Sequence, residues 1–212
     1  MNGTPRTIGT AALWLRVSKT GGTGRLAGPS SAYELGFDSL ARLRREAGTL
    51  PQPAEGEAPD YTVIGNRFVL DACTADRAEA AVREFVERKR TKALSFEIED
   101  EVDRYTISSL SATERVELAL EPVVDGRATG RMSIRGIGDY DLTFLTPEAL
   151  VAAAEAGVES DGYAFFGNVF VLGDLTPEGM RAAATHLVRT DQVTLLAPVD
   201  HEYGADIRAK GR

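Results

Sequence analysis

Two arginines, Arg25 and Arg131, lie beside glycine turns and have the chemistry to hold an anion. The tripeptide Thr-Gly-Arg that ends at Arg25 recurs with its arginine at position 131. A guanidinium group offers several N–H donors in a planar fork, which suits carboxylate and phosphate oxygens. Tyr33 and Tyr140 follow the two arginines at similar spacing and would form the walls of such a site. We therefore predict Arg25, Arg131, Tyr33 and Tyr140 as ligand-binding residues.

The same two arginines have a structural alternative. Each would form an ion pair with a nearby acid, Glu34 for Arg25 and Asp141 for Arg131. The glycine turn at residues 19–25 (KTGGTGR) also follows a predicted strand, as a phosphate-binding loop would. Such a loop needs a lysine after its last glycine and then a helix, whereas here an arginine and the sequence LAGPS follow. The turn is therefore expected to join two strands of a hairpin.

Few residues have the types and spacing that catalysis needs. The two histidines are His186, within a predicted helix, and His201, in a predicted loop, and neither has metal-ligand spacing. Cys73 precedes a helix start, a position that can lower the pKa of a thiol. Leu175 holds the matching place in the second copy of the sequence, so a buried apolar position is the alternative. We expect no catalytic residue, no metal site and no cofactor, and we lean against an enzyme without deciding the point.

Two runs of charge fall outside these motifs. Residues 97–103 (EIEDEVD) carry closely spaced carboxylates that could bind Ca²⁺ or Mg²⁺. The alternative is a charged edge strand that resists pairing with other chains. The basic run at residues 88–92 (RKRTK) ends a predicted helix, where cations complement the helix dipole. The matching residues of the second copy are not basic, so a basic binding surface would belong to the first copy alone.

The elements that must position these residues come from a stretch that the chain contains twice. Residues 61–74 read YTVIGNRFVLDACT and residues 163–176 read YAFFGNVFVLGDLT. The pattern Tyr-x-Leu-x-Phe also recurs, at residues 33–37 and 140–144. We interpret the chain as an internal tandem duplication whose two α+β repeats are the domains 1–110 and 111–212.

Each copy of the repeated stretch predicts two strands joined by a tight turn. Four β-prone residues, then Gly-Asn, then four more form the pattern of a β-hairpin, with the glycine at the first turn position, where a positive φ is needed. The Phe-Val-Leu runs at residues 68–70 and 170–172 are continuously apolar. Such runs predict strands that are covered on both faces.

Threonines predict where two helices begin. Thr74 and Thr176 are placed as N-caps, with acids in the first turn and Pro177 at the first helical position of the second helix. Apolar residues follow both caps at helical spacing. A strand is expected after each helix, at residues 93–98 and 193–199.

The remaining segments complete each half. A strand is predicted at residues 10–18, and helices are predicted at about residues 39–47 and from Thr146 to Gly157. Residues 50–60 carry prolines and acids without periodicity and are expected to be a surface linker. Each half thus follows the order β-β-β-α-β-β-α-β, a β-hairpin followed by a ferredoxin-like βαββαβ unit.

Composition limits the partners. The 212 residues include 32 acidic and 24 basic side chains, a net charge of −8, which argues against a nucleic acid or an anionic membrane surface as partner. One cysteine allows no intrachain disulfide and fits a reducing compartment. No run approaches the roughly 20 apolar residues that span a bilayer, and no signal peptide is recognisable. We therefore expect a soluble cytoplasmic protein without a membrane partner.

The predicted fold class is α+β, with an internal duplication. Because no polar cluster suits catalysis and the two halves would present near-equivalent surfaces, we predict a non-enzymatic structural or assembly protein that acts through protein–protein contacts or self-assembly. A component of a larger particle or a virion is one form of this prediction. The alternative is a small-ligand-binding or regulatory module with its site at the junction of the two halves.

Overall fold

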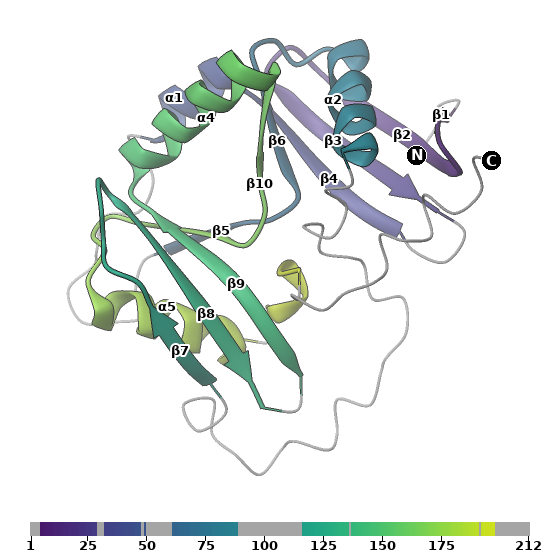
Figure 1. Cartoon of the computed structure of the whole chain (residues 1–212). Coiled ribbons are helices and arrows are strands. Elements are labelled where there is room, and N and C mark those ends of the chain that lie inside the picture. Colours follow the sequence, from purple (N-terminus) through teal and green to yellow (C-terminus); the bar gives the residue numbers. More distant parts are fainter. Residues whose placement is uncertain are drawn as a thin grey trace.

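The computed structural model describes residues 5–28, 32–47, 49, 61–88, 116–135, 137–190 and 192–197. These residues form a mixed α+β fold with two mixed β-sheets and four α-helices (Figure 1). Several predicted features lie outside the described residues, namely the linker at 50–60, the strand at 93–98, the acidic run at 97–103, residues 89–92 of the basic run, His201 and the domain boundary at 110/111.

The described elements fall into two series, one in residues 1–110 (the first half) and one in residues 111–212 (the second half). The first half contains β1 (Arg6–Ile8), β2 (Ala11–Val17), β3 (Gly21–Ala27), β4 (Ala32–Ser39), α1 (Leu40–Ala47), β5 (Tyr61–Ile64), β6 (Arg67–Leu70) and α2 (Ala75–Glu87). The second half contains β7 (Val116–Leu120), β8 (Arg127–Ile134), β9 (Gly138–Leu145), α4 (Pro147–Asp161), β10 (Tyr163–Phe166), β11 (Val169–Leu172), α5 (Pro177–Arg189) and the 3-10 helix η3 (Val193–Leu195).

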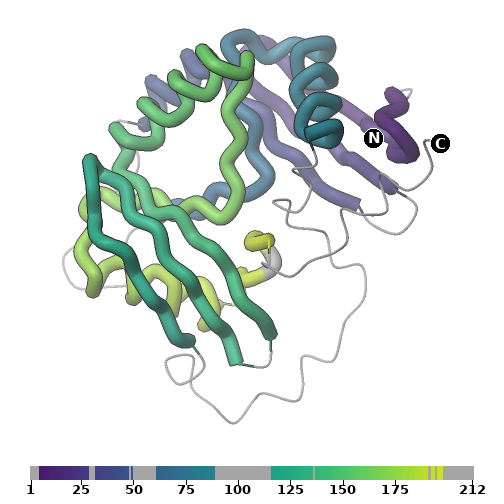
Figure 2. Tube along the Cα trace, viewed as in Figure 1, coloured from purple at the N-terminus to yellow at the C-terminus, as the bar shows by residue number. Residues whose placement is uncertain are grey.

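The two halves exchange strands, which corrects the predicted hairpins. The first sheet has the order β1-β2-β3-β4-β6-β10 and the second has the order β5-β11-β9-β8-β7. The strands β5 and β6 do not pair with each other: β5 pairs antiparallel with β11, and β6 pairs antiparallel with β10. Figure 2 shows the trace of β10 beside that of β6. Each half therefore completes its sheet with a strand from the other half.

The Gly-Asn dipeptides turn the chain from one sheet into the other. The sequence predicts a positive φ at the glycine of each dipeptide. In the structure the positive φ angles belong instead to the asparagines, 48° at Asn66 and 54° at Asn168. The main-chain oxygen of Asn66 accepts from the N–H of Gly36 at 2.9 Å, and that of Asn168 accepts from the N–H of Thr143 at 3.0 Å. Asparagine tolerates the left-handed conformation because its short polar side chain can form local hydrogen bonds. In each copy, the segment that passes from one sheet to the other is thus held to a neighbouring strand by this main-chain hydrogen bond.

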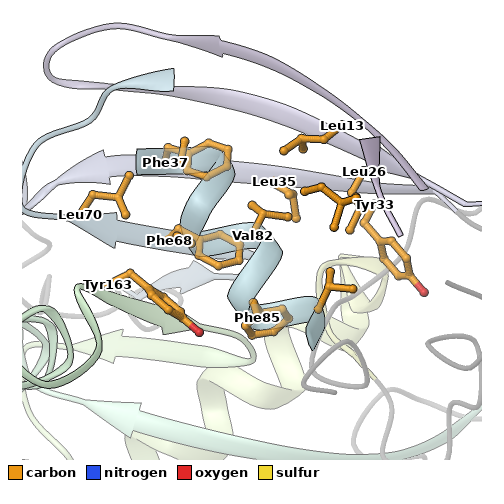
Figure 3. Close-up of a cluster of buried hydrophobic side chains, with 14 of the residues drawn as sticks. Leu13, Leu26, Tyr33, Leu35, Phe37, Phe68, Leu70, Val82, Phe85 and Tyr163 are labelled. Atoms are coloured by element: carbon orange, nitrogen blue, oxygen red, sulfur yellow. The ribbon is translucent and has the colours of Figure 1, made fainter. Parts of the chain in front are cut away.

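The core consists of three clusters of buried side chains. The first lies between the first sheet and α2, and the second lies between the second sheet and α5. Figure 3 shows that Tyr163, which belongs to β10, lies in the first cluster, and its ring lies 5.8 Å from that of Phe68. The third cluster joins α1 and α4 to the strands β5, β6, β9, β10 and β11 at the junction of the two halves. The Phe-Val-Leu runs are buried throughout, as predicted for strands covered on both faces.

The helix caps are where the sequence places them. The Oγ1 atoms of Thr74, Thr146 and Thr176 each accept a hydrogen bond from a main-chain N–H three residues later, at 3.1–3.3 Å. The helix α4 does not end at Gly157 as predicted but continues to Asp161, and Gly162 caps it with a φ of 76°. A Cβ atom at Gly157 would lie 2.7 Å from the Cβ of Ala164, so this glycine permits close packing of α4 on β10.

Two further expectations are corrected by the described residues. The segment Val193–Leu195 is a 3-10 helix, although the sequence predicts a strand there. The first predicted strand begins at residue 10, yet Arg6–Ile8 form an earlier strand, β1, and pair with Ala11–Leu13 of β2. The Arg6 guanidinium contacts Asp76 at 3.0 Å, which ties this strand to α2.

Candidate functional site

The first sheet has one face covered by α2 and an opposite face that is open over β2–β4 but covered by α1 and α4 at Val69 of β6 and over β10. The helix α2 packs against β1, β2 and β6, and most inward side chains of β2, β3 and β4 are buried, with Leu15 and Val17 partly buried. Side chains alternate between the faces of a strand. The opposite face over β2–β4 and β6, which we call the first sheet face, carries exposed or half-buried side chains, namely Trp14, Arg16, Thr23, Arg25, Glu34 and Arg67.

The predicted arginine Arg25 lies on this face and forms an ion pair. Its Nε atom is 3.7 Å from a carboxylate oxygen of Glu34, which is its cross-strand neighbour on β4. The pair is about half exposed, so its contribution to stability is less than about 1 kcal/mol. Tyr33 points to the other side of β4, and its side chain is buried in the first core cluster.

The second predicted arginine lies on a different sheet. Arg131 is on β8, where its guanidinium lies 3.0 Å from a carboxylate oxygen of Asp139. Its cross-strand neighbour is Asp141, the acid named in the structural alternative. Tyr140 is buried in the second core cluster, and burial raises the pKa of its phenol. The structure thus distributes the four predicted ligand residues over two sheets and two cores, and their binding of a ligand stays a prediction.

A polar cluster that the sequence did not reveal lies at the end of β4. The Asp38 side chain is only 6% exposed, and it faces two guanidinium groups. One oxygen lies 3.2 Å from Arg42 of α1, and the other pairs closely with Arg67 of β6. A Cβ atom at Gly36 would lie 3.1 Å from the Nε of Arg67, so the glycine leaves room for that guanidinium. The cluster joins three elements of the first half.

The second half has apolar residues at the places of this cluster. Asp38 pairs in register with Val69, and Leu145 pairs in the same way with Val171. Arg67 lies opposite Gly36, and Val169 lies opposite Thr143. Sequence reasoning missed the cluster because Arg67 lies 29 residues after Asp38 and meets it only through the parallel pairing of β4 with β6. Arg42 follows Asp38 by four residues, but that spacing alone does not show that the carboxylate is buried.

The second sheet likewise has one face covered by α5 and an opposite face that is open over β7 and β8 but covered by α4 at Leu145 of β9 and over β11. The helix α5 packs on the face that carries Met132, Leu142 and Phe144. The opposite face, which we call the second sheet face, carries charged side chains on β7, β8, β9 and the residues beside them, namely Glu117, Glu121, Arg127, Arg131, Asp139 and Asp141. In Figure 1 the helix α2 lies in front of the first sheet, whereas α5 lies behind the second sheet. The two open faces therefore point to opposite sides of the molecule.

A groove lies at the junction of the two halves. Its volume is about 530 Å³, and its walls come from α2, β8, β9, α4, β10 and β11. Aromatic side chains of Phe85, Tyr163 and Phe165 line it together with the charged groups of Arg127 and Asp161. Arg88 binds Asp161 at 2.8 Å, so that this carboxylate connects α2 with α4. Arg25 does not line this groove, and Arg131 does not line it either.

His186 and Cys73, the candidates for acid–base or nucleophilic chemistry that the structure describes, both lie beside core residues. The ring Nδ1 of His186 is 2.9 Å from the hydroxyl oxygen of Tyr61, on the surface of the second core. Cys73 is buried with 2% exposure, and burial together with the nearby Asp38 carboxylate raises the pKa of its thiol. A raised pKa disfavours the nucleophilic thiolate. This placement agrees with the alternative of a buried apolar position for Cys73.

Within the described ranges, the structure has no group of three or more metal-ligating side chains. No helix in the described part of the chain is long and apolar enough to cross a membrane. The chain matches no protein-family model, no curated protein and no solved structure.

Proposed function

We propose that this protein is a non-enzymatic assembly protein that acts through protein–protein contacts. The observation that carries the proposal is the pair of open sheet faces, each backed by a helix on its covered side and rich in charged side chains. A broad, charged face of this kind suits a protein partner better than a small molecule, because small ligands bind in concave and mostly apolar pockets. A chain with two such faces can contact two neighbours at once, as a component of a larger particle must.

The proposal includes the origin of the chain by tandem duplication. The strands β5, β6 and the helix α2 begin and end 102 residues before β10, β11 and α5, respectively, as their bounds show. The five-strand series β2-β3-β4-β6-β10 and β7-β8-β9-β11-β5 also have the same order. Each half keeps the β-α-β-β-α order of a ferredoxin-like unit, with one strand supplied by the other half. Duplication of a strand-exchanged homodimer would give this arrangement directly.

The size of the purified protein tests the assembly proposal. We expect analytical ultracentrifugation to show species larger than one chain at micromolar concentration, or native mass spectrometry from the source cell to show a protein partner. A chain that remains monomeric up to 100 micromolar and carries no protein partner would contradict the proposal. Neither measurement depends on knowing the partner in advance.

The groove at the junction favours a second candidate, a small-ligand-binding or regulatory module. Its aromatic walls and its two charged groups are typical of a pocket for an aromatic or aliphatic anion or zwitterion. Native mass spectrometry reports this outcome as a small mass added to the single chain. Replacing Phe165 by Glu would remove that added mass if the groove holds it, while replacing the distant Arg25 by Gln would not.

A further inference from the structure

We propose that two copies of this chain associate head to tail, with the first sheet face of one copy against the second sheet face of the next. This inference rests on the proposed assembly function and specifies the partner, a second copy, and the two surfaces in contact. Its basis is the opposite overall charge of the two sheet faces, which includes one reversal at equivalent positions, Arg16 in the first sheet and Glu121 in the second.

The first sheet face is mainly basic. Arg16 lies across from Thr23, which lies across from Gly36 and then Arg67, so these residues form one row across four strands. Arg16 is exposed, and the side chain of Arg67 is 41% exposed. The neighbouring row contains Trp14, Arg25 and Glu34. Three guanidinium groups and a half-buried indole thus lie on this face, against the exposed carboxylate of Glu34 and the buried carboxylate of Asp38, which Arg67 shares with Arg42 of α1.

The second sheet face is mainly acidic. Thr23 of β3 and Thr129 of β8 hold equivalent positions. Arg16 lies across from Thr23, and Glu121 lies across from Thr129, whose carbonyl accepts from the Glu121 N–H at 2.9 Å. Glu121 therefore holds the position of Arg16. The position of Trp14, across from Arg25, is held by Ala119, across from Arg131. The exposed acids Glu117 and Asp141 add to Glu121 on this face. With Asp139 and Arg127 included, this face carries four carboxylates and two guanidinium groups. The guanidinium groups are those of Arg127 and Arg131.

Opposite charge on opposite sides of one molecule determines how copies meet. Like faces repel each other, so a symmetric contact between two first faces or two second faces is disfavoured. A first face against a second face brings arginines to carboxylates and covers Trp14 with the small side chain of Ala119. Such a contact is heterologous, and it continues from copy to copy into a ring or a filament.

Charge reversal of one residue on each face tests this contact. We expect Arg16→Glu to weaken self-association roughly tenfold or more, and Glu121→Arg to do the same, because each puts like charges together. Glu117→Arg is the second variant for the acidic face. Arg77→Glu on α2 and Glu159→Arg on α4 change the same charges away from both faces and should leave association unchanged. Circular dichroism and thermal unfolding confirm that each variant is folded.

A mixture of the two single variants gives the decisive result. The Arg16→Glu chain keeps its acidic face and the Glu121→Arg chain keeps its basic face, and the two reversed faces also carry opposite charges at positions 16 and 121. We expect the mixture to restore association between unlike chains in a one-to-one ratio, although each variant alone is mainly monomeric. Raising the salt concentration from 50 to 500 mM should weaken the wild-type assembly, because screening shortens the range of these charges.

The outcomes separate the two proposals. Wild-type oligomers that survive both charge reversals would overturn the head-to-tail contact while leaving the assembly function standing. If the Glu121→Arg chain still forms homodimers while the Arg16→Glu chain is monomeric, two first sheet faces contact each other symmetrically. That result would also overturn the head-to-tail contact. A monomeric wild-type chain that binds a different protein would overturn self-association, and one that binds no protein would overturn both proposals.

Discussion

The hydroxyl oxygen of Tyr61 lies 2.9 Å from Nδ1 of His186, and this contact connects the two halves of the chain. Tyr61 belongs to β5 of the first half, and His186 belongs to α5 of the second half. The two rings also meet edge to face, with centroids 5.6 Å apart. The ring of Tyr61 packs in addition against Phe170, at 5.7 Å, so that a first-half side chain takes part in the second core.

We expect Tyr61→Phe to lower the free energy of unfolding by about 1 kcal/mol, the usual value of one hydrogen bond. Tyr61→Ala should cost about 3 kcal/mol, because it also removes the ring that fills the second core. Urea unfolding followed by circular dichroism measures both. If the two variants lose equal stability, the ring packing across the halves contributes nothing and the account is wrong.

Stability should decrease at alkaline pH because of two tyrosines. Burial raises the pKa of Tyr61 and of Tyr140 above the ordinary value of 10.0. The folded state therefore favours the neutral phenol, and this contribution is present below pH 10 and is lost as the pH rises through the folded pKa values. Unfolding free energies between pH 8 and pH 12 should fall less steeply in the double variant Tyr61→Phe, Tyr140→Phe. An unchanged slope in that variant would show that other groups cause the alkaline loss.

We expect the cluster of Asp38, Arg42 and Arg67 to tolerate replacement of all three residues by apolar ones, whereas replacement of Asp38 alone should lower the stability. Asp38→Leu leaves Arg42 and Arg67 facing each other without their carboxylate, which should cost about 2 kcal/mol, less than for a fully buried pair because both arginines are partly exposed. Changing Arg42→Ala and Arg67→Val as well copies the second half, where Val169 holds the place of Arg67. Ala149 holds the place of Arg42, because its N–H donates to the Thr146 hydroxyl as that of Arg42 donates to the Ser39 hydroxyl. We expect thermal unfolding of the triple variant to return close to the wild-type midpoint. A triple variant less stable than Asp38→Leu alone would contradict this.

Gly157 should resist replacement even by alanine. Alanine in a helix is ordinarily more stabilising than glycine by about 1 kcal/mol. Here the added Cβ would lie 2.7 Å from the Cβ of Ala164, so we expect Gly157→Ala to destabilise by about 1–3 kcal/mol through overpacking. Ala164→Gly in the same chain should recover much of the loss, since it removes the atom in conflict. Denaturant unfolding of the two single variants and the double variant completes the cycle, and additive losses would exclude the proposed contact.

Local features of the sequence were sufficient to predict the starts of three helices and the buried strands, although not the 3-10 helix at Val193–Leu195. Thr74, Thr146 and Thr176 have the side chains that satisfy free N–H groups at a helix start, and all three cap helices in the structure. The Phe-Val-Leu runs have no polar face, and both are buried. The repeat also predicted that corresponding elements recur in the same order.

The partners of the strands could not be predicted in this way. A Gly-Asn dipeptide between two strands satisfies the turn chemistry of a hairpin, and nothing nearby in sequence shows that β5 instead pairs with β11. The same limit applied to Gly157, whose neighbour Ala164 lies on a strand after the helix, so that a packing glycine resembled a helix end. The charge difference between the sheet faces became visible only with the register, which places Arg16 and Glu121 at equivalent positions.

The strand exchange has a consequence for how the protein is made. The first sheet needs β10, Tyr163–Phe166, to cover the edge of β6, and the second core needs Tyr61 from a strand synthesised long before it. The chain emerges from the ribosome with its N-terminus first. The sheet of the first half therefore stays incomplete until β10 of the second half has emerged. During that interval a neighbouring nascent chain on the same messenger could supply the missing strand. Synthesis rate and chaperone protection are therefore expected to govern the yield of this fold more than its final stability does.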